Sequence, residues 1–318
     1  MRSALLLRRF SCAGFLAAIL LLAGCALNAP QTAQLIDTTP DGLPRRHLIA
    51  QVPFHAQDAF QCGPAALAMA LNHSGVAVAP DDLVSRVYVP ARQGSFQVEM
   101  LAASRAYQRL SMPIRPTLEA LLRWIAADQP VLVLQNLGLS WYPRWHYAVV
   151  IGYDLDAGKI TLHSGETAFY TLPLRTFEHT WARSQQWGMV ALIPGDLPVV
   201  ESEESYFQAL AAFEGAGGRG VGKAWRAGLQ HWPESRNLLM GYGNHLYGSK
   251  QYAAAAQQYR RVVALNPEYA PAFNNLAAAL VERGDRAGAI AAATRAIALD
   301  PGNAARYREN LVAAQALP

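Results

Sequence analysis

The pattern of apolar and polar positions divides the chain into stretches of different character. A mainly apolar run covers residues 10–22, and a polar stretch without an apolar period follows over 26–46. Residues 47–196 combine helical periods with short β-branched or aromatic runs, whereas residues 202–318 show only helical periods. The chain is therefore expected to contain two folded domains behind an N-terminal leader.

The first folded stretch begins with helical patterns and ends with strand patterns. Asp154–Gly158 supplies turn residues between two of the expected strands, which indicates a hairpin. Helices followed by an antiparallel sheet are typical of the α+β class. The pattern predicts helices over 62–74, 82–87, 97–110 and 118–127, and strands over 131–136, 146–153, 159–163 and 187–193.

The second stretch repeats. Pro233, Pro267 and Pro301 are spaced by 34 residues, and small residues recur at equivalent positions before them. This period resembles the tetratricopeptide repeat, an array of antiparallel helix pairs, with an unrelated helical bundle as the alternative. The expected copies cover 202–235, 236–269 and 270–303, and residues 304–318 form a closing helix. The glycine-rich run 215–222 is interpreted as a turn, because it lacks the Gly-Lys-Ser/Thr ending of a phosphate loop.

The N-terminus is typical of an exported protein. Three arginines precede the apolar run, which is short for a membrane span and ends in Leu-Ala-Gly before Cys25. This ending resembles the processing site of bacterial lipoproteins, so we expect residues 1–24 to be a signal peptide and Cys25 to be lipidated. An ordinary signal peptide is the alternative. Residues 25–46 are expected to be a flexible tether, and the Ala-Leu pair after Cys25 favours the periplasmic face of the outer membrane.

Charge adds little after the leader is removed. The formal net charge of +4 includes three leader arginines, and 24 basic residues then face 23 acidic ones without any run of one sign. Nothing indicates a nucleic-acid partner, and we expect the lipid anchor to be the only attachment to a membrane. No metal or other cofactor is expected, since one thiol makes a poor metal site.

Cys62 is the candidate nucleophile. Cys12 and Cys25 belong to the leader and its processing site, so no partner remains for a disulfide. Cys62 stands at the start of a predicted helix, where backbone N–H groups and the helix dipole are expected to lower the pKa of a thiol. Gly63 and Pro64 follow, removing bulk beside the sulfur and fixing the first turn. Inert core packing is the alternative.

His146 is the candidate base. It opens the apolar strand 146–153, where a polar side chain is costly unless it is used or paired. His55, His73 and His163 are less well placed for this role. A hydrogen-bonded core histidine is the alternative for His146.

Residues 51–165 resemble the papain-like cysteine peptidases related to bacteriocin double-glycine leader peptidases. The runs that carry the resemblance are Gln-Cys-Gly-Pro-Ala-Ala-Leu-Ala-Met at 61–69 and His-Tyr-Ala-Val-Val-Ile-Gly-Tyr-Asp at 146–154, in that order. The resemblance implies a papain-like fold, with Cys62 attacking a peptide carbonyl to form a thioester. It also implies that His146 activates the thiol and then protonates the leaving amine.

Two positions depart from the family pattern. The relatives place an oxyanion-hole glutamine six residues before the cysteine, where this chain has Ala56, so Gln57 is the expected substitute rather than Gln61. On the strand after the histidine they place an aspartate, and here Ser164 falls nearest that position. His163 and Glu166 are the alternatives for this third member. The substitution puts catalytic strength in question more than the fold.

The sequence therefore predicts an envelope lipoprotein with cysteine peptidase activity, whose repeats bind a protein partner or substrate. A catalytically weak or inactive assembly lipoprotein that acts through its repeats is the second hypothesis. A cell-wall peptide amidase, which keeps the thioester chemistry, is the third.

Overall fold

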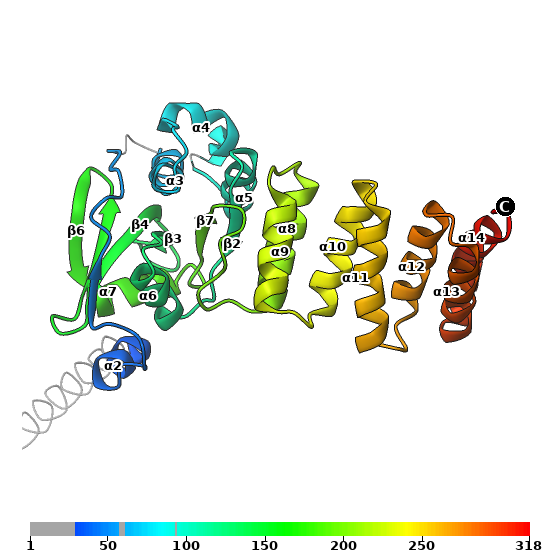
Figure 1. Ribbon diagram of the computed structural model, residues 1–318. Coiled ribbons are helices and arrows are strands. Elements are labelled where there is room, and N and C mark those ends of the chain that lie inside the picture. The colour runs from blue at the N-terminus through cyan, green and yellow to red at the C-terminus, as the bar shows by residue number, and fades with distance from the viewer. Residues whose placement is uncertain (1–28, 57–60, 93) are drawn as a thin grey trace, which may run out of the picture.

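The computed structural model describes residues 29–56, 61–92 and 94–318. Figure 1 shows a mixed α/β part followed by a row of paired helices that extends to the C-terminus. The expected signal peptide and Cys25 lie outside the described residues. No helix in the described ranges is both long enough and apolar enough to cross a bilayer.

One antiparallel sheet organises the first part, which confirms the α+β class. Its strands follow the order β2-β7-β3-β4-β5-β6, and β1 pairs with the far end of β4, along the edge that β3 leaves. The strands predicted at 131–136, 146–153, 159–163 and 187–193 are present, whereas β1, β2 and β6 were not predicted. The strands are β1 Arg46–Leu48, β2 Leu110–Pro113, β3 Val131–Asn136, β4 Trp145–Asp154, β5 Lys159–Ser164, β6 Thr167–Pro173 and β7 Gly188–Leu192.

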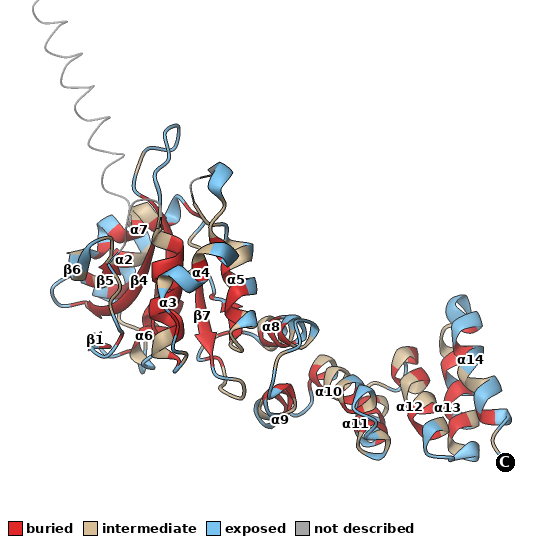
Figure 2. Ribbon diagram, turned by 90° about the horizontal axis from the view of Figure 1, so that it is seen from above, coloured by how far each residue is buried: buried red, intermediate tan, exposed pale blue. Residues whose placement is uncertain are grey.

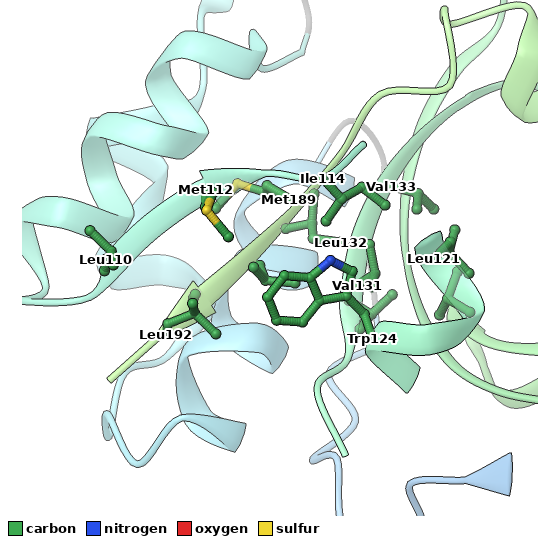
Figure 3. Packing of buried hydrophobic residues seen from close by; sticks show 14 of the residues in the cluster. Leu110, Met112, Ile114, Leu121, Trp124, Val131, Leu132, Val133, Met189 and Leu192 are labelled. Atoms are coloured by element: carbon green, nitrogen blue, oxygen red, sulfur yellow. The ribbon is translucent and has the colours of Figure 1, made fainter. Parts of the chain in front are cut away.

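Helices cover both faces of the sheet. Figure 1 shows α3 on one side, with α6 and α7 on the other. This explains why all six residues of β3 are buried, since a strand covered on both faces has no solvent side. Trp124 of α6 packs with Val131 and Leu132 of β3, and Met112 and Met189 lie nearby on β2 and β7 (Figure 3).

The helices of this part begin close to their predicted starts. Thr117 caps α6 as expected, its hydroxyl accepting a hydrogen bond from Ala120 N. The helix predicted over 97–110 ends early, because the chain turns at Gln108, which has a positive φ, and enters β2. The helices are α3 Cys62–His73, α4 Pro80–Val87, α5 Gln97–Ala106, α6 Leu118–Ala126 and the unpredicted α7 Leu174–Ala182, with a short 3-10 helix at Pro90–Arg92.

The expected flexible tether is wrong for its described part. Residues 30–37 form the helix α2 (Pro30–Asp37), which packs on α6 and α7. The buried carboxylate of Glu178 on α7 accepts hydrogen bonds from Gln31 N at 3.1 Å and Thr32 N at 2.8 Å. A carboxylate that satisfies the first N–H groups of a helix also complements its dipole. The polar composition of this segment thus reflects a capped surface helix.

The helical part consists of pairs with a regular 34-residue period, followed by one further helix. Arg236, Ala270 and Ala304 begin equivalent helices. Equivalent contacts also recur: Arg261 donates to Pro233 O and Arg295 to Pro267 O. The helices are α8 Glu203–Gly215, α9 Val221–His231, α10 Arg236–Gly248, α11 Tyr252–Leu265, α12 Ala270–Glu282, α13 Arg286–Leu299 and α14 Ala304–Gln315.

Close approach of the paired helices depends on the small residues. A side chain at Gly243 of α10 would meet the ring of Tyr259 on α11, and Ala277 and Ala289 are fully buried. The glycine-rich run forms the α8–α9 turn, with positive φ at Gly217 and Gly220.

The two parts share one hydrophobic core. Buried residues of α8 and α9, including Tyr206 and Phe213, belong to the same apolar cluster as the sheet, and α8 packs on β2. Glu201, just before α8, accepts hydrogen bonds from Arg115 N at 2.8 Å and from the indole of Trp124 at 3.3 Å. Figure 2 shows α8 against the sheet domain, with the remaining helices leading away from it. The first helix pair is therefore fixed to the α+β domain.

Candidate active site

Cys62 is the first residue of α3, as predicted. It is a partly buried, unpaired thiol, and Gln61 before it has non-helical backbone angles. The backbone N–H groups of Tyr147, Gly63 and Cys62 itself hydrogen-bond the sulfur. Since Tyr147 directly follows His146, the thiol lies against the beginning of β4.

The pKa of the Cys62 thiol differs from the sequence-based expectation. Burial raises this pKa above its ordinary value, and the three backbone N–H groups offset only part of the rise. The helix start therefore does not suffice to produce a thiolate, as desolvation outweighs it. Ionisation of this thiol needs a neighbouring base.

His146 is the second residue of β4, and its imidazole pairs with Ser164. Nε2 of His146 lies 2.8 Å from Oγ of Ser164, the last residue of β5. The register of the two strands explains this contact: Val149 pairs with His163, so Ser164 falls opposite Ala148, on the same face as His146. The contact occupies Nε2 and leaves Nδ1 as the ring nitrogen available for a thiol.

Among the residues that the structure describes, no hydrogen bond joins the Cys62 thiol to the imidazole of His146. Catalytic hydrogen bonds are often long in a ligand-free site and tighten when substrate binds. Burial lowers the pKa of His146 below its ordinary value. Burial therefore favours the neutral form of both groups, the Cys62 thiol and the His146 imidazole.

The two alternatives for the third member lie elsewhere. His163 is fully buried between the rings of Phe54 and Phe169, and both of its nitrogens are bonded. Nε2 contacts Val52 O at 3.0 Å, and Nδ1 accepts from Phe169 N at 3.2 Å. Glu166 is exposed in the turn between β5 and β6. Of the three candidates, Ser164 is the one bonded to His146.

Gln57 cannot be placed, because it lies outside the described residues. Gln61, the rejected candidate, is the N-cap of α3 and partly buried. In the described ranges, no three His, Cys, Asp or Glu side chains gather as a metal site requires.

Sequence reasoning missed a contact that fixes the first turn of α3. The hydroxyl of Tyr147 donates to Ser95 O at 3.1 Å, and burial is the main cause of the raised pKa of Tyr147. A Cβ on Gly63 would lie 2.7 Å from the Ser95 Cβ. Gly63 is thus required because residue 95 packs directly on the helix start, a contact between positions 32 residues apart that local sequence does not reveal.

A second missed residue is Asn136, which shapes the loop before His146. Its buried Oδ1 accepts hydrogen bonds from Gly138 N and Arg144 N, both at 2.9 Å. These bonds close the base of an aromatic hairpin, defined here as residues 137–145, that projects beside the site. An asparagine at a strand end is a familiar turn-forming signal that could have identified it.

Cys62 begins a helix that packs on β4, and the second residue of β4 is His146, so the two candidate groups belong to adjoining elements of an α+β scaffold. Residues 49–189 match the model of the Peptidase C39 like family and form a domain of that family.

The chain is also similar to solved structures. A C39-like peptidase from Bacillus anthracis is 17% identical with a TM-score of 0.40, covering 46% of this chain and 97% of that chain. A double glycine motif protease from an AMS/PCAT transporter, in complex with the leader peptide, is 20% identical with a TM-score of 0.34, covering 45% and 91%. A variant of the O-GlcNAc transferase of Thermobaculum terrenum is 28% identical with a TM-score of 0.31, covering 36% and 23%. No curated protein matches this chain.

Proposed function

We propose that this protein is a cysteine peptidase of the bacterial cell envelope, lipid-anchored through Cys25. The observation that carries the proposal is the His146–Ser164 pair beside a thiol that the Tyr147 N–H contacts. Membership of residues 49–189 in the Peptidase C39 like family supports it.

The chemistry follows from the two neutral groups. Nδ1 of His146 takes the proton of Cys62 as the sulfur bonds to the peptide carbonyl carbon. The carbon–nitrogen bond then breaks, and the imidazolium returns the proton to the leaving amine. Water, deprotonated by the same imidazole, attacks the thioester and releases the acid and the thiol. Gln57 is the proposed donor to the carbonyl oxygen during both steps.

A thiol-reactive peptide probe tests this proposal on the processed chain. We expect covalent labelling that Cys62→Ala abolishes and His146→Ala reduces by roughly 10²-fold or more, the usual contribution of a general base. His73→Ala is the matched control, since that partly buried imidazole hydrogen-bonds to Asp128 O and not to a residue of the site. Labelling that survives Cys62→Ala, or that His146→Ala leaves unchanged, contradicts the proposal.

A catalytically weak scaffold is a second candidate function, favoured by Ser164 itself. A hydroxyl can fix the imidazole tautomer but stabilises an imidazolium less than a carboxylate does. In this case the repeats carry the function. Deletion of residues 202–318 would abolish the cellular role, whereas Cys62→Ala would leave it intact. The opposite pattern selects the peptidase.

We propose further that residues 202–318 are tetratricopeptide repeats that bind a protein partner or substrate. The 34-residue period and the paired helices support this, because stacked helix pairs present extended binding surfaces. The Cys62→Ala chain, used as bait for crosslinking in the envelope, should retain a partner that it loses when residues 236–318 are removed. Retention without those residues contradicts the assignment.

A further inference from the structure

Only a short stretch of chain separates the expected lipid anchor at Cys25 from the N-terminal helix α2. Ala29 follows Cys25 by four residues, a length of chain that spans at most about 14 Å when fully extended. Beyond it, α2 is docked through Glu178, so residues 30–37 add no reach. A lipid on Cys25 therefore holds the α+β domain against the bilayer.

Helix α7 connects this entry point to the aromatic hairpin. Glu178 holds the first turn of α2, and Arg183, at the end of α7, donates from Nη1 to Gly138 O at 2.7 Å. Five residues of helix separate the two contacts, or roughly 8 Å along the axis. Figure 2 shows α2 and α7 next to one another. The start of α2 and the base of the hairpin are thus both attached to α7, at positions close together along its axis.

The side chains of the hairpin are unusual for a surface in water. Trp141 is 80% exposed, Tyr142 68% and Trp145 54%, and both Leu137 and Leu139 are more than half exposed. Exposed apolar clusters of this kind mark interaction sites, and tryptophan and tyrosine favour the interface between lipid and water. Within the hairpin, the sole charged residue is Arg144.

The charge around the hairpin favours an anionic surface. Arg144 in the hairpin and Arg175 and Arg183 on α7 are all exposed. Glu178, the acidic residue of α7, is buried under α2 and therefore does not present its charge to a membrane. Basic residues beside an aromatic cluster are the combination that binds anionic headgroups.

We propose that the aromatic hairpin inserts into the interfacial layer of an anionic phospholipid bilayer and, with the anchor at Cys25, holds the active site at the membrane surface. The inference rests on the anchor of the proposed function. Because His146 directly follows Trp145, the peptide bonds within reach are those of membrane-proximal segments of envelope proteins. Insertion would add a second membrane contact to the expected lipid anchor.

Native tryptophan fluorescence tests the insertion independently of cellular lipidation. The processed chain, with Cys62→Ala, is coupled through Cys25 to a maleimide lipid in vesicles of phosphatidylglycerol and phosphatidylethanolamine. Brominated acyl chains in the vesicles quench nearby indoles. Trp124, Trp181 and Trp225 are buried, so they should not contribute.

We expect bromolipid quenching that Trp141→Phe with Trp145→Phe removes, while the control Trp232→Phe on the helical part leaves it in place. Both targets are exposed, so their replacement spares the core. Absence of quenching in a chain that floats with the vesicles overturns the proposal. The hairpin then lines a peptide groove, and the double variant should raise KM instead.

Mass spectrometry of Cys25 from the cell envelope separately judges the anchor. An unacylated Cys25 would refute the proposed anchor and still leave the fluorescence result valid.

Discussion

Oγ of Ser164, the last residue of β5, lies 2.8 Å from Nε2 of His146, near the start of β4. The hydroxyl orients the ring but brings no negative charge. Burial lowers the pKa of His146 and raises that of Cys62, so it favours the neutral form of both groups.

Ser164→Asp should therefore strengthen the site. A carboxylate beside the imidazole raises the pKa of His146, typically by 1–3 units, and increases the thiolate–imidazolium population by roughly tenfold or more. Iodoacetamide alkylation of Cys62 at pH 7 measures this population. Ser164→Asn is the matched control, because it keeps a hydrogen-bond acceptor without the charge. Equal rates in the two variants would show that charge at residue 164 does not govern the thiol.

The shifts of the two pKa values predict a broad pH profile. His146 cannot act as a base once it is protonated. The decrease of kcat/KM at acid pH should therefore have its midpoint below pH 6.5, the ordinary pKa of histidine. At high pH, kcat/KM should decrease when the proton of the Cys62 and His146 pair is lost. This should occur above pH 9.0, the ordinary pKa of the thiol. Peptide hydrolysis from pH 4 to 10 measures both limbs. An acid limb with its midpoint above pH 6.5 would contradict the lowered pKa of His146.

His163 should make the fold sensitive to acid. Burial lowers its pKa, so below the ordinary value of 6.5 the unfolded chain binds a proton that the folded chain excludes. The contribution of His163 to the free energy of unfolding is thus fully present above that pH. It is lost as the pH falls towards the folded-state pKa, by up to about 1.4 kcal/mol per pH unit.

Urea denaturation at pH 7.5 and pH 5.5 measures this loss. His163→Leu should be less stable at pH 7.5, since Val52 O and Phe169 N lose their partner. Its stability should also depend less on pH. His179→Leu, on a partly exposed residue of α7, is the control. An unchanged pH dependence in His163→Leu excludes this origin.

Glu178→Gln should release α2 from the domain. The substitution keeps the shape but removes the charge, and an amide NH₂ then faces one of the N–H groups of Gln31 and Thr32. We expect a loss of about 1–3 kcal/mol and faster hydrogen exchange over residues 30–37. Glu309→Gln, on an exposed position of α14, provides the comparison. Slow exchange in Glu178→Gln would mean that packing alone holds α2.

The sequence revealed what local patterns encode. The helix start at Cys62, the cap at Thr117 and the strand at 131–136 each depend on neighbours within a few residues, and the structure has them at those places. The period of 34 likewise places the helix pairs. Ser164 was the preferred third member, and strand register brings it to His146.

What the sequence could not reveal depends on distant contacts. The polar segment at 30–37 becomes a helix because Glu178, almost 150 residues later, caps it. Strand β1 exists because the far edge of β4 is open to it. The thiol pKa was misjudged because desolvation depends on how tightly α3 packs against β4, which no local motif records.

Because a single hydrophobic core joins the sheet to α8 and α9, the row of helices has a fixed position on the α+β domain and does not move freely on a linker. A protein bound along these helices would therefore lie at a constant distance from the sulfur of Cys62. The number of substrate residues between the bound segment and the active site would then determine the cleavage site. Lengthening that part of the substrate would move the scissile bond by the same number of residues.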